Sequence, residues 1–164
     1  MESILQQQLK KQQPFDSLEQ EAYLNLLRTH NMLSAAPNRL LKKNALSSAQ
    51  YNILRILEGN SAEGLPCLEI VSQMVTRVPD ITRLVDRLEE AGLVTRNRSL
   101  EDRRVVLIAL TDKGKQLIGS MHDPLNQIHQ NTLGHLSQEE LTELNRLLVK
   151  ARDKAEAAHS NSAG

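Results

Sequence analysis

The chain has 164 residues, and its 20 lysines and arginines balance its 20 aspartates and glutamates, so the formal net charge at pH 7 is +0. This length suits one compact core, or a small domain with helical extensions. The neutral total argues against a polybasic tail or a protein that coats nucleic acid without specificity, although DNA binding depends on where the charges lie. Aromatic residues make up only 2% of the chain, which argues against single-strand binding by base stacking.

No targeting signal and no disulfide framework are expected. The polar N-terminus does not resemble a signal peptide, and no apolar run approaches the ~20 residues that span a bilayer. The one cysteine, Cys67, has no second cysteine with which to form an intrachain disulfide. A cytoplasmic location is therefore expected.

Residues 1–15 are predicted to form a flexible polar arm, and a long helix follows over 16–44. Asp16 followed by Glu19 is typical of a helix start, because the Asp16 side chain can accept from free backbone N–H groups. Leucines recur along this helix in one rough stripe. Pro37 falls inside the helix and is expected to kink or divide it.

Three helices are predicted in the middle of the chain. The first begins with the capping pattern of Ser47 and Gln50, and the second follows Pro66. A tight turn separates the second from the third, for which Pro79 suits the first position. Gly92 ends the third helix. The apolar residues of this third helix recur at spacings of three, four and three: Ile81, Leu84, Val85 and Leu88.

The period then changes from that of a helix to that of a strand. Residues 93–96 and 105–110 are β-rich, and the polar loop 97–102 lies between them. This pattern predicts a hairpin with a long charged tip.

Two further helices are predicted towards the C-terminus. Thr111 caps the first, and Pro124 is expected to bend it. Ser137 with Glu140 is a capping box for the second. Residues 158–164 are small and polar and are predicted to be a disordered tail.

The order of these elements predicts a mainly α (α+β) protein: a winged helix-turn-helix with N- and C-terminal dimerisation helices. The DNA-binding lobe is expected over 45–110, between the dimerisation helices at 16–44 and 111–157. Both terminal segments carry wide apolar stripes that would be an aggregation liability on a monomer, so a homodimer is expected. A dimer would hold two recognition helices about 34 Å apart, which predicts a pseudo-palindromic site.

The basic residues of this lobe are all arginines. The planar fork of arginine suits bidentate contacts with phosphate and guanine. Chance clustering on a solvated surface is an equally good explanation of the composition taken alone. The residues are Arg55, Arg77, Arg83, Arg87, Arg96, Arg98, Arg103 and Arg104.

Three phrases follow one another between Leu68 and Ile118. They are ITRLVDRLE at 81–89, Gly-Leu-Val at 92–94, and the wing phrase Asp-Arg-Arg at 102–104 followed by LTDKG at 110–114. In this order they resemble the MarR family of winged helix-turn-helix transcriptional regulators. Pro37 and Pro79 depart from the usual pattern of that family.

The resemblance implies a homodimer whose first and last helices interlock. It also implies one recognition helix per subunit in the major groove of double-stranded DNA and one wing per subunit in an adjacent minor groove. Many members are repressors that respond to a small-molecule effector or to oxidation, with the signal site between the dimer helices and the DNA-binding lobe.

Within the recognition helix, Arg83 is the best candidate for reading a base, with guanine as the expected partner. Arg77 and Thr82 are expected to hold phosphate, which fixes register rather than sequence. Arg87 lies further from the helix tip, so a salt bridge with Asp86 or Glu90 is favoured over a DNA contact.

In the wing, Arg103 and Arg104 are expected to be neighbours on a strand, with side chains on opposite faces. The resemblance points to Arg104 as the minor-groove residue, oriented by Asp102; a surface pair worth ~0–1 kcal/mol is the alternative. Arg96 and Arg98 are expected to contact the DNA backbone or to stay solvated. The candidate DNA-binding residues are Arg77, Asp80, Thr82, Arg83, Arg87, Arg98, Asp102, Arg103 and Arg104.

The sequence thus favours a sequence-specific DNA-binding transcriptional regulator, with a repressor as the first expectation. A winged-helix module that binds protein is the alternative, and it should lack solvent-directed arginines at Arg83 and Arg104. No catalytic constellation, cofactor motif or metal-ligand spacing is present, so neither an enzyme nor a metal site is expected. Cys67 is a candidate redox sensor near a helix start, although isolated cysteines are more often inert core residues.

Overall fold

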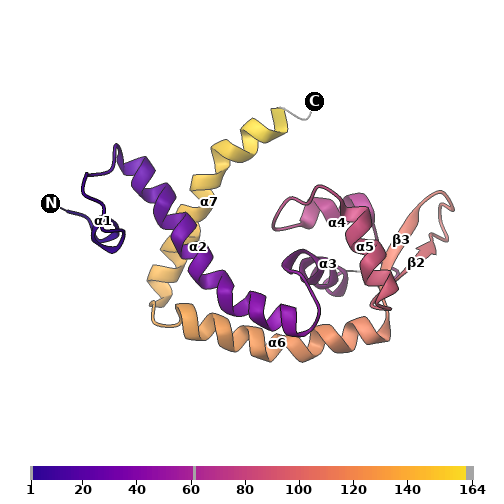
Figure 1. Cartoon of the computed structure of the whole chain (residues 1–164). Coiled ribbons are helices and arrows are strands. Elements are labelled where there is room, and N and C mark those ends of the chain that lie inside the picture. The colour runs from indigo at the N-terminus through magenta and orange to yellow at the C-terminus, as the bar shows by residue number, and fades with distance from the viewer. Residues whose placement is uncertain (1, 61, 162–164) are drawn as a thin grey trace. The chain divides into compact units, whose positions relative to one another are not determined.

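The computed structural model describes residues 2–60 and 62–161 (Figure 1). They belong to two compact units, residues 1–125 and 126–164. The helices are α1 (Ile4–Gln8), α2 (Leu18–Lys43), α3 (Ser48–Glu58), α4 (Cys67–Gln73), α5 (Ile81–Glu90), α6 (Asp112–Leu133) and α7 (Gln138–Asn161); the strands are β1 (Leu65–Pro66), β2 (Val94–Arg98) and β3 (Val106–Leu110). A mainly helical chain with one small sheet and a helix-turn-helix confirms the predicted fold class.

The first unit begins with an element that the sequence did not predict, because the short helix α1 lies within the expected polar arm. The long helix α2 follows, but its N-cap is Ser17 rather than Asp16. The Ser17 side chain accepts a hydrogen bond from the backbone N–H of Gln20 at 3.1 Å. α2 continues through Pro37 to Lys43, so the expectation that Pro37 divides it is wrong.

The helix-turn-helix is built from α3, α4 and α5. Ser47 and Gln50 form both halves of the predicted capping box at the start of α3. The start of α5 differs from the prediction: Asp80 is its N-cap, so Pro79 precedes the helix instead of occupying its first turn. Gly92, at φ +69°, adopts the left-handed conformation that ends α5, as predicted.

The sheet is three-stranded, with the order β1-β3-β2. Strands β2 and β3 form the predicted hairpin, with Val94 opposite Leu110 and Arg98 opposite Val106. The two-residue strand β1 was not predicted; it pairs Leu65 with Ile108 on the other edge of β3. Such a short strand has no readable period, so only the tertiary pairing defines it.

One apolar core joins these elements within the first unit. Its fully buried side chains come from α3, α4, α5, β3 and α6. They are Ile53, Leu54, Ile70, Val85, Leu88, Ile108, Ile118 and Met121. The face of α5 away from this core, with Arg83 and Arg87, is therefore exposed to solvent.

The start of α6 is fixed tightly to the end of the sheet. The hydroxyl of Thr111 donates to the carbonyl of Gly92 at 2.7 Å and accepts from the backbone N–H of Gly114 at 3.0 Å, which confirms the predicted cap. A Cβ on Gly114 would lie 2.2 Å from the carbonyl oxygen of Leu93. Glycine is therefore required where α6 passes this turn.

The second unit contains the end of α6 and helix α7. Ser137 and Glu140 form the predicted capping box, with backbone-to-side-chain hydrogen bonds of 2.8 and 3.3 Å. α6 also continues through Pro124. α7 extends to Asn161, so the first four residues of the expected disordered tail, 158–161, are helical, and residues 162–164 lie outside the described part of the chain. No described helix combines the length and apolarity needed to cross a membrane.

We expect Gly114→Ala to destabilise the protein by about 1–3 kcal/mol, because the new methyl group meets the backbone of Leu93 and cannot be accommodated by a side-chain rotation. Urea unfolding measures the loss. Gly119→Ala in the same helix is the control: nothing lies within 4 Å of its Cβ position, so it should be neutral or stabilising by up to about 1 kcal/mol. Equal stability of the two variants would contradict this packing.

Candidate DNA-binding surface

Helix α5 separates its side chains into three strips. Val85 and Leu88 are fully buried and hold the helix on the core. Arg83 and Arg87, four residues apart, are exposed on a second strip. Asp86 and Glu89, three residues apart, form a third strip along the flank of the helix. The apolar, basic and acidic strips therefore point in different directions.

The first turn of α5 is held by Asp80. Its carboxylate accepts a hydrogen bond from the backbone N–H of Arg83 at 3.0 Å. This satisfies one of the free N–H groups of the helix start. Asp80 was predicted to be a DNA contact; the structure gives it a capping role that positions Arg83.

The turn before α5 is held by Asn52, a residue that no pattern in the sequence predicts. The side-chain carbonyl of Asn52, on α3, accepts from the backbone N–H of Val75 at 2.8 Å. Arg77 and Thr82 follow this turn and are exposed. No local pattern identifies Asn52, because its partner lies 23 residues away in the sequence.

The tip of the wing, residues 99–105, is ordered by short-range hydrogen bonds. The hydroxyl of Ser99 accepts from the backbone N–H groups of Glu101 and Asp102 at 3.2 and 3.4 Å. The carboxylate of Asp102 accepts from the backbone N–H of Arg104 at 2.9 Å. Asp102 therefore orients Arg104 through its backbone rather than through a side-chain ion pair.

The structure corrects the geometry expected of the two wing-tip arginines. Arg103 and Arg104 lie in a turn before β3, not on a strand, so the argument from alternating strand faces does not apply to them. Both are exposed, as is Arg98 at the end of β2. The reason is that β3 begins only at Val106, so both arginines fall within the tip and not on the strand.

Arg96 has a different environment from the one expected. Its guanidinium donates to Asp86 at 2.6 Å and also to Glu89, so it bridges both acids of α5 from strand β2. The pKa of Arg96 is raised above its usual value, mainly because its guanidinium donates a hydrogen bond to Asp86. The expectation that Arg96 is solvated or bound to DNA backbone is wrong for the free protein, and Asp86 pairs with Arg96 instead of Arg87.

Solvent exposure distinguishes the two candidate functions. All the candidate DNA-binding residues, from Arg77 to Arg104, are exposed. In particular Arg83 and Arg104 point into solvent from the recognition helix and from the wing, in the same compact unit. This is the arrangement expected of a DNA-binding lobe and not of the protein-binding alternative.

Comparison with known proteins agrees with this geometry. Residues 37–121 match the family model described as Transcriptional regulator SarA/Rot. The HTH-type transcriptional repressor IacR of Pseudomonas putida is 32% identical over 75% of this chain and 72% of its own length. The chain belongs to the SarA/Rot family of MarR-type winged-helix transcriptional regulators.

Solved structures support the same assignment. A MarR transcription factor from Planctomyces limnophilus is 47% identical, with a TM-score of 0.63 over 82% of this chain and 98% of that one. CouR from Rhodococcus jostii, solved with p-coumaroyl-CoA bound, is 28% identical, with a TM-score of 0.70 over 86% and 96% of the two chains. The present MarR-type protein is thus a DNA-binding transcriptional regulator, as its sequence predicted.

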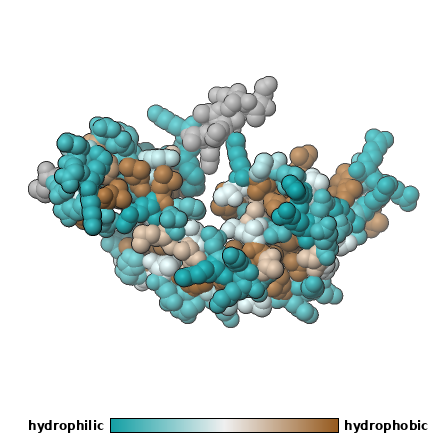
Figure 2. Space-filling view, in the orientation of Figure 1, coloured by the Kyte–Doolittle hydropathy of each residue, from teal (hydrophilic) through white to brown (hydrophobic). Residues whose placement is uncertain are grey.

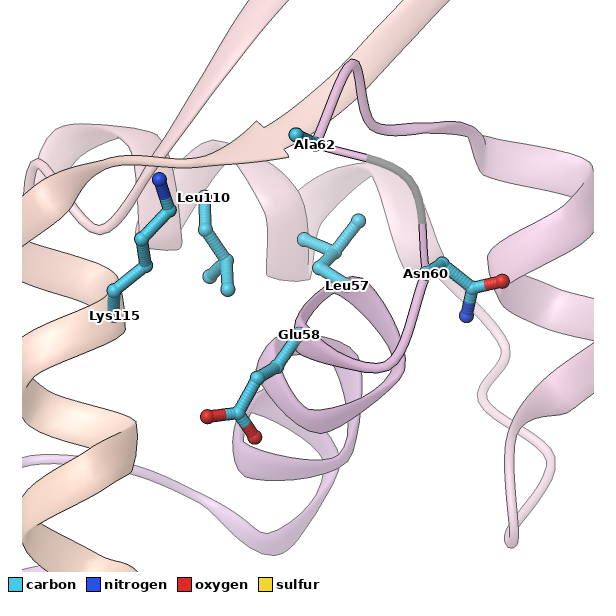
Figure 3. Close-up of a pocket in the computed structure, with 6 residues that line it drawn as sticks. All are labelled: Leu57, Glu58, Asn60, Ala62, Leu110 and Lys115. Atoms are coloured by element: carbon cyan, nitrogen blue, oxygen red, sulfur yellow. The ribbon is translucent and has the colours of Figure 1, made fainter.

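This MarR-type protein also contains a cavity of about 340 Å³ between the end of α3, the loop that follows it, the end of β3 and the start of α6 (Figure 3). Leu57 and Glu58 reach it from α3, and Lys115 reaches it from α6. The carboxylate of Glu58 also lies 3.1 Å from Nε2 of His122 and pairs with Arg55. The cavity therefore presents both apolar walls and charged groups.

Two other predicted features concern redox and metal chemistry. Cys67 is a free thiol of intermediate exposure at the first residue of α4, so it is not a core residue. Its redox role stays a prediction. Within residues 2–60 and 62–161, no group of three or more His, Cys, Asp or Glu side chains is arranged to hold a metal ion.

We expect Asp80→Ala to lower the free energy of unfolding by about 1 kcal/mol, because the N-cap of α5 is lost. Asp80→Asn is the matched variant, since asparagine caps as well as aspartate does, and it should retain most of the stability. Urea unfolding distinguishes the two. If alanine were as stable as asparagine at this position, Asp80 would not act as the cap.

Proposed function

We propose that this regulator binds double-stranded DNA as a homodimer and acts as a repressor, with α5 in the major groove and the wing in the minor groove. The observation that carries the proposal is the shared exposure of Arg83, on α5, and Arg104, at the tip of the wing, in one compact unit. The major groove admits an α-helix, and a narrow minor groove attracts arginine. The repressor IacR supports the direction of the regulation.

The roles of individual residues follow from where they lie. Arg83 is in the first turn of α5, the part of a recognition helix that contacts base edges, so it reads guanine. Thr82 lies in the same turn, Arg77 lies in the loop before it, and both hold phosphate. Arg87 is one turn further along the same strip and contacts the adjacent backbone. In the wing, Arg104 enters the minor groove, and Arg98 and Arg103 neutralise phosphate.

We expect Arg83→Ala to cost about 1–3 kcal/mol of operator binding and to relax specificity at one base pair. Arg77→Ala is the comparison: it should weaken binding to all sequences alike and lower the slope of log K against log salt concentration by about 1. Fluorescence anisotropy with an operator from the protein's own upstream region measures both. If Arg83→Ala keeps the full base preference of the parent, the base-reading role is wrong.

The dimer is proposed from the helices outside the winged lobe, over 16–44 and 111–157. On α2, Tyr23, Leu26 and Leu27 share one face and are 61%, 44% and 49% exposed. In Figure 2, hydrophobic surface lies at the end of the first unit that carries α1 and the start of α2. On α7, Leu144 and Leu147 are likewise exposed. A second copy would remove these side chains from water.

We expect Leu27→Glu to convert the protein to a monomer at micromolar concentration, because a charge would be buried in the dimer interface. Met32→Glu is the control, since Met32 is 66% exposed and lies about 140° around α2 from Leu27. Sedimentation equilibrium gives the mass of each variant. A monomeric parent protein would contradict the proposed dimer.

We further propose that a small molecule controls the binding of this regulator to its operator. CouR is a regulator of the same fold that was solved with p-coumaroyl-CoA bound. The cavity at Leu57, Glu58 and Lys115, at about 340 Å³, falls within the size range of small-molecule sites. The dimer would have two states, one in which the spacing of its recognition helices matches the operator and one in which it does not. An effector that binds the second state more tightly would shift the population towards it and so lower operator affinity.

A further inference from the structure

The acidic strip of α5, Asp86 and Glu89, would repel the negative charge of DNA when the helix approaches it. Asp86 and Glu89 are half-exposed, at 50% and 39% of their side-chain surface. Asp86 is next to Arg87 in the sequence and three residues from Arg83. Double-stranded DNA carries one negative charge for every ~1.7 Å of its length, so two free carboxylates here would oppose binding.

Arg96 forms ion pairs with both carboxylates, and the pairing of strand β2 with β3 holds its backbone in place. It bridges Asp86 at 2.6 Å and Glu89 with the two ends of one guanidinium, and only 27% of its side chain is exposed. Its backbone pairs with Ile108 of β3, which is 1% exposed in the core. The wing strand is therefore linked by charge to the flank of the recognition helix.

The apolar face of α5 sets the side of the helix that faces solvent, and a polar contact can set its rotation more closely. Val85 and Leu88 bury one side, and apolar contacts are non-directional. A planar guanidinium that holds two carboxylates three residues apart does impose a direction. This direction sets where Arg83 and Arg87, on the neighbouring strip, point.

We propose that Arg96 is a positioning residue for DNA recognition: it neutralises Asp86 and Glu89 and orients α5 so that the basic strip faces the groove. The inference rests on the proposed DNA-binding mode of α5. Arg96 itself does not contact DNA. Its place on β2 makes the wing and the recognition helix one rigid reading surface.

The test uses the full-length protein and measures affinity for operator and for non-specific duplex over a range of salt concentrations. Arg96→Gln should weaken operator binding about tenfold, the size of one charged hydrogen-bond network, and leave the salt slope unchanged, because Arg96 contacts no phosphate. Non-specific binding should fall by a smaller factor, because the freed carboxylates repel every duplex whereas the lost orientation of α5 affects only base contacts. Arg98→Gln, two residues along the same strand and exposed, is the matched comparison. It should weaken both duplexes alike and lower the slope by about 1.

A second variant keeps the test decisive if Arg96→Gln folds poorly. The double substitution Asp86→Asn with Glu89→Gln removes negative charge beside DNA, so electrostatics alone would tighten binding. Loss of the orienting contact predicts weaker operator binding instead. In this background, Arg96→Gln should have little further effect, because its partners are already gone.

Three results would overturn the role of Arg96. One is a uniform loss on all duplexes with a lower salt slope, which would make Arg96 a phosphate contact. Another is a lower melting temperature with unchanged operator affinity, which would make it structural only. The third is tighter operator binding by the Asp86→Asn/Glu89→Gln variant. A parent protein that binds no operator would instead refute the proposed function.

Discussion

Helix α5 has to be buried on one side and available on another, and the rest of the lobe is arranged around that constraint. Val85 and Leu88 are completely buried, so α5 cannot leave the core without exposing them. Burial of such side chains is worth about 1.5–3 kcal/mol each, which is a large part of the stability of a small lobe. Because the anchor lies on one face, Arg83 and Arg87 on another face stay in solvent.

The hairpin extends this arrangement beyond the helix. Its base packs into the core through Ile108, while its tip at 99–105 is held by hydrogen bonds of Ser99 and Asp102 that need no tertiary contact. The tip is therefore both ordered and exposed. Arg96 lies between these two regions and links strand β2 to α5 by its pairs with Asp86 and Glu89. A neutral chain can thus present positive charge locally, because Asp86 and Glu89, the two acids on the flank of α5, are paired with Arg96 within the protein.

Several features could be predicted because they depend on neighbours in the sequence. The capping box of Ser47 with Gln50, the stop at Gly92 and the cap at Thr111 are all local, and each is found in the structure. Competition between adjacent residues explains the small errors. Both Asp16 and Ser17 can cap α2, and the backbone conformation selects Ser17. Pro79 could have begun α5, but Asp80 next to it is the better cap.

The sequence by itself determined the order of helices α2 to α7 and of strands β2 and β3, the apolar face of α5 and the set of arginines on the lobe, because periodicity and capping operate within a few residues. Only the tertiary structure decided that β1 pairs with β3, that Asn52 holds the turn before α5, and that Arg96 bridges Asp86 and Glu89 rather than lying free. These contacts join separate elements whose relative placement depends on packing of the whole core. No spacing rule along the chain encodes that placement.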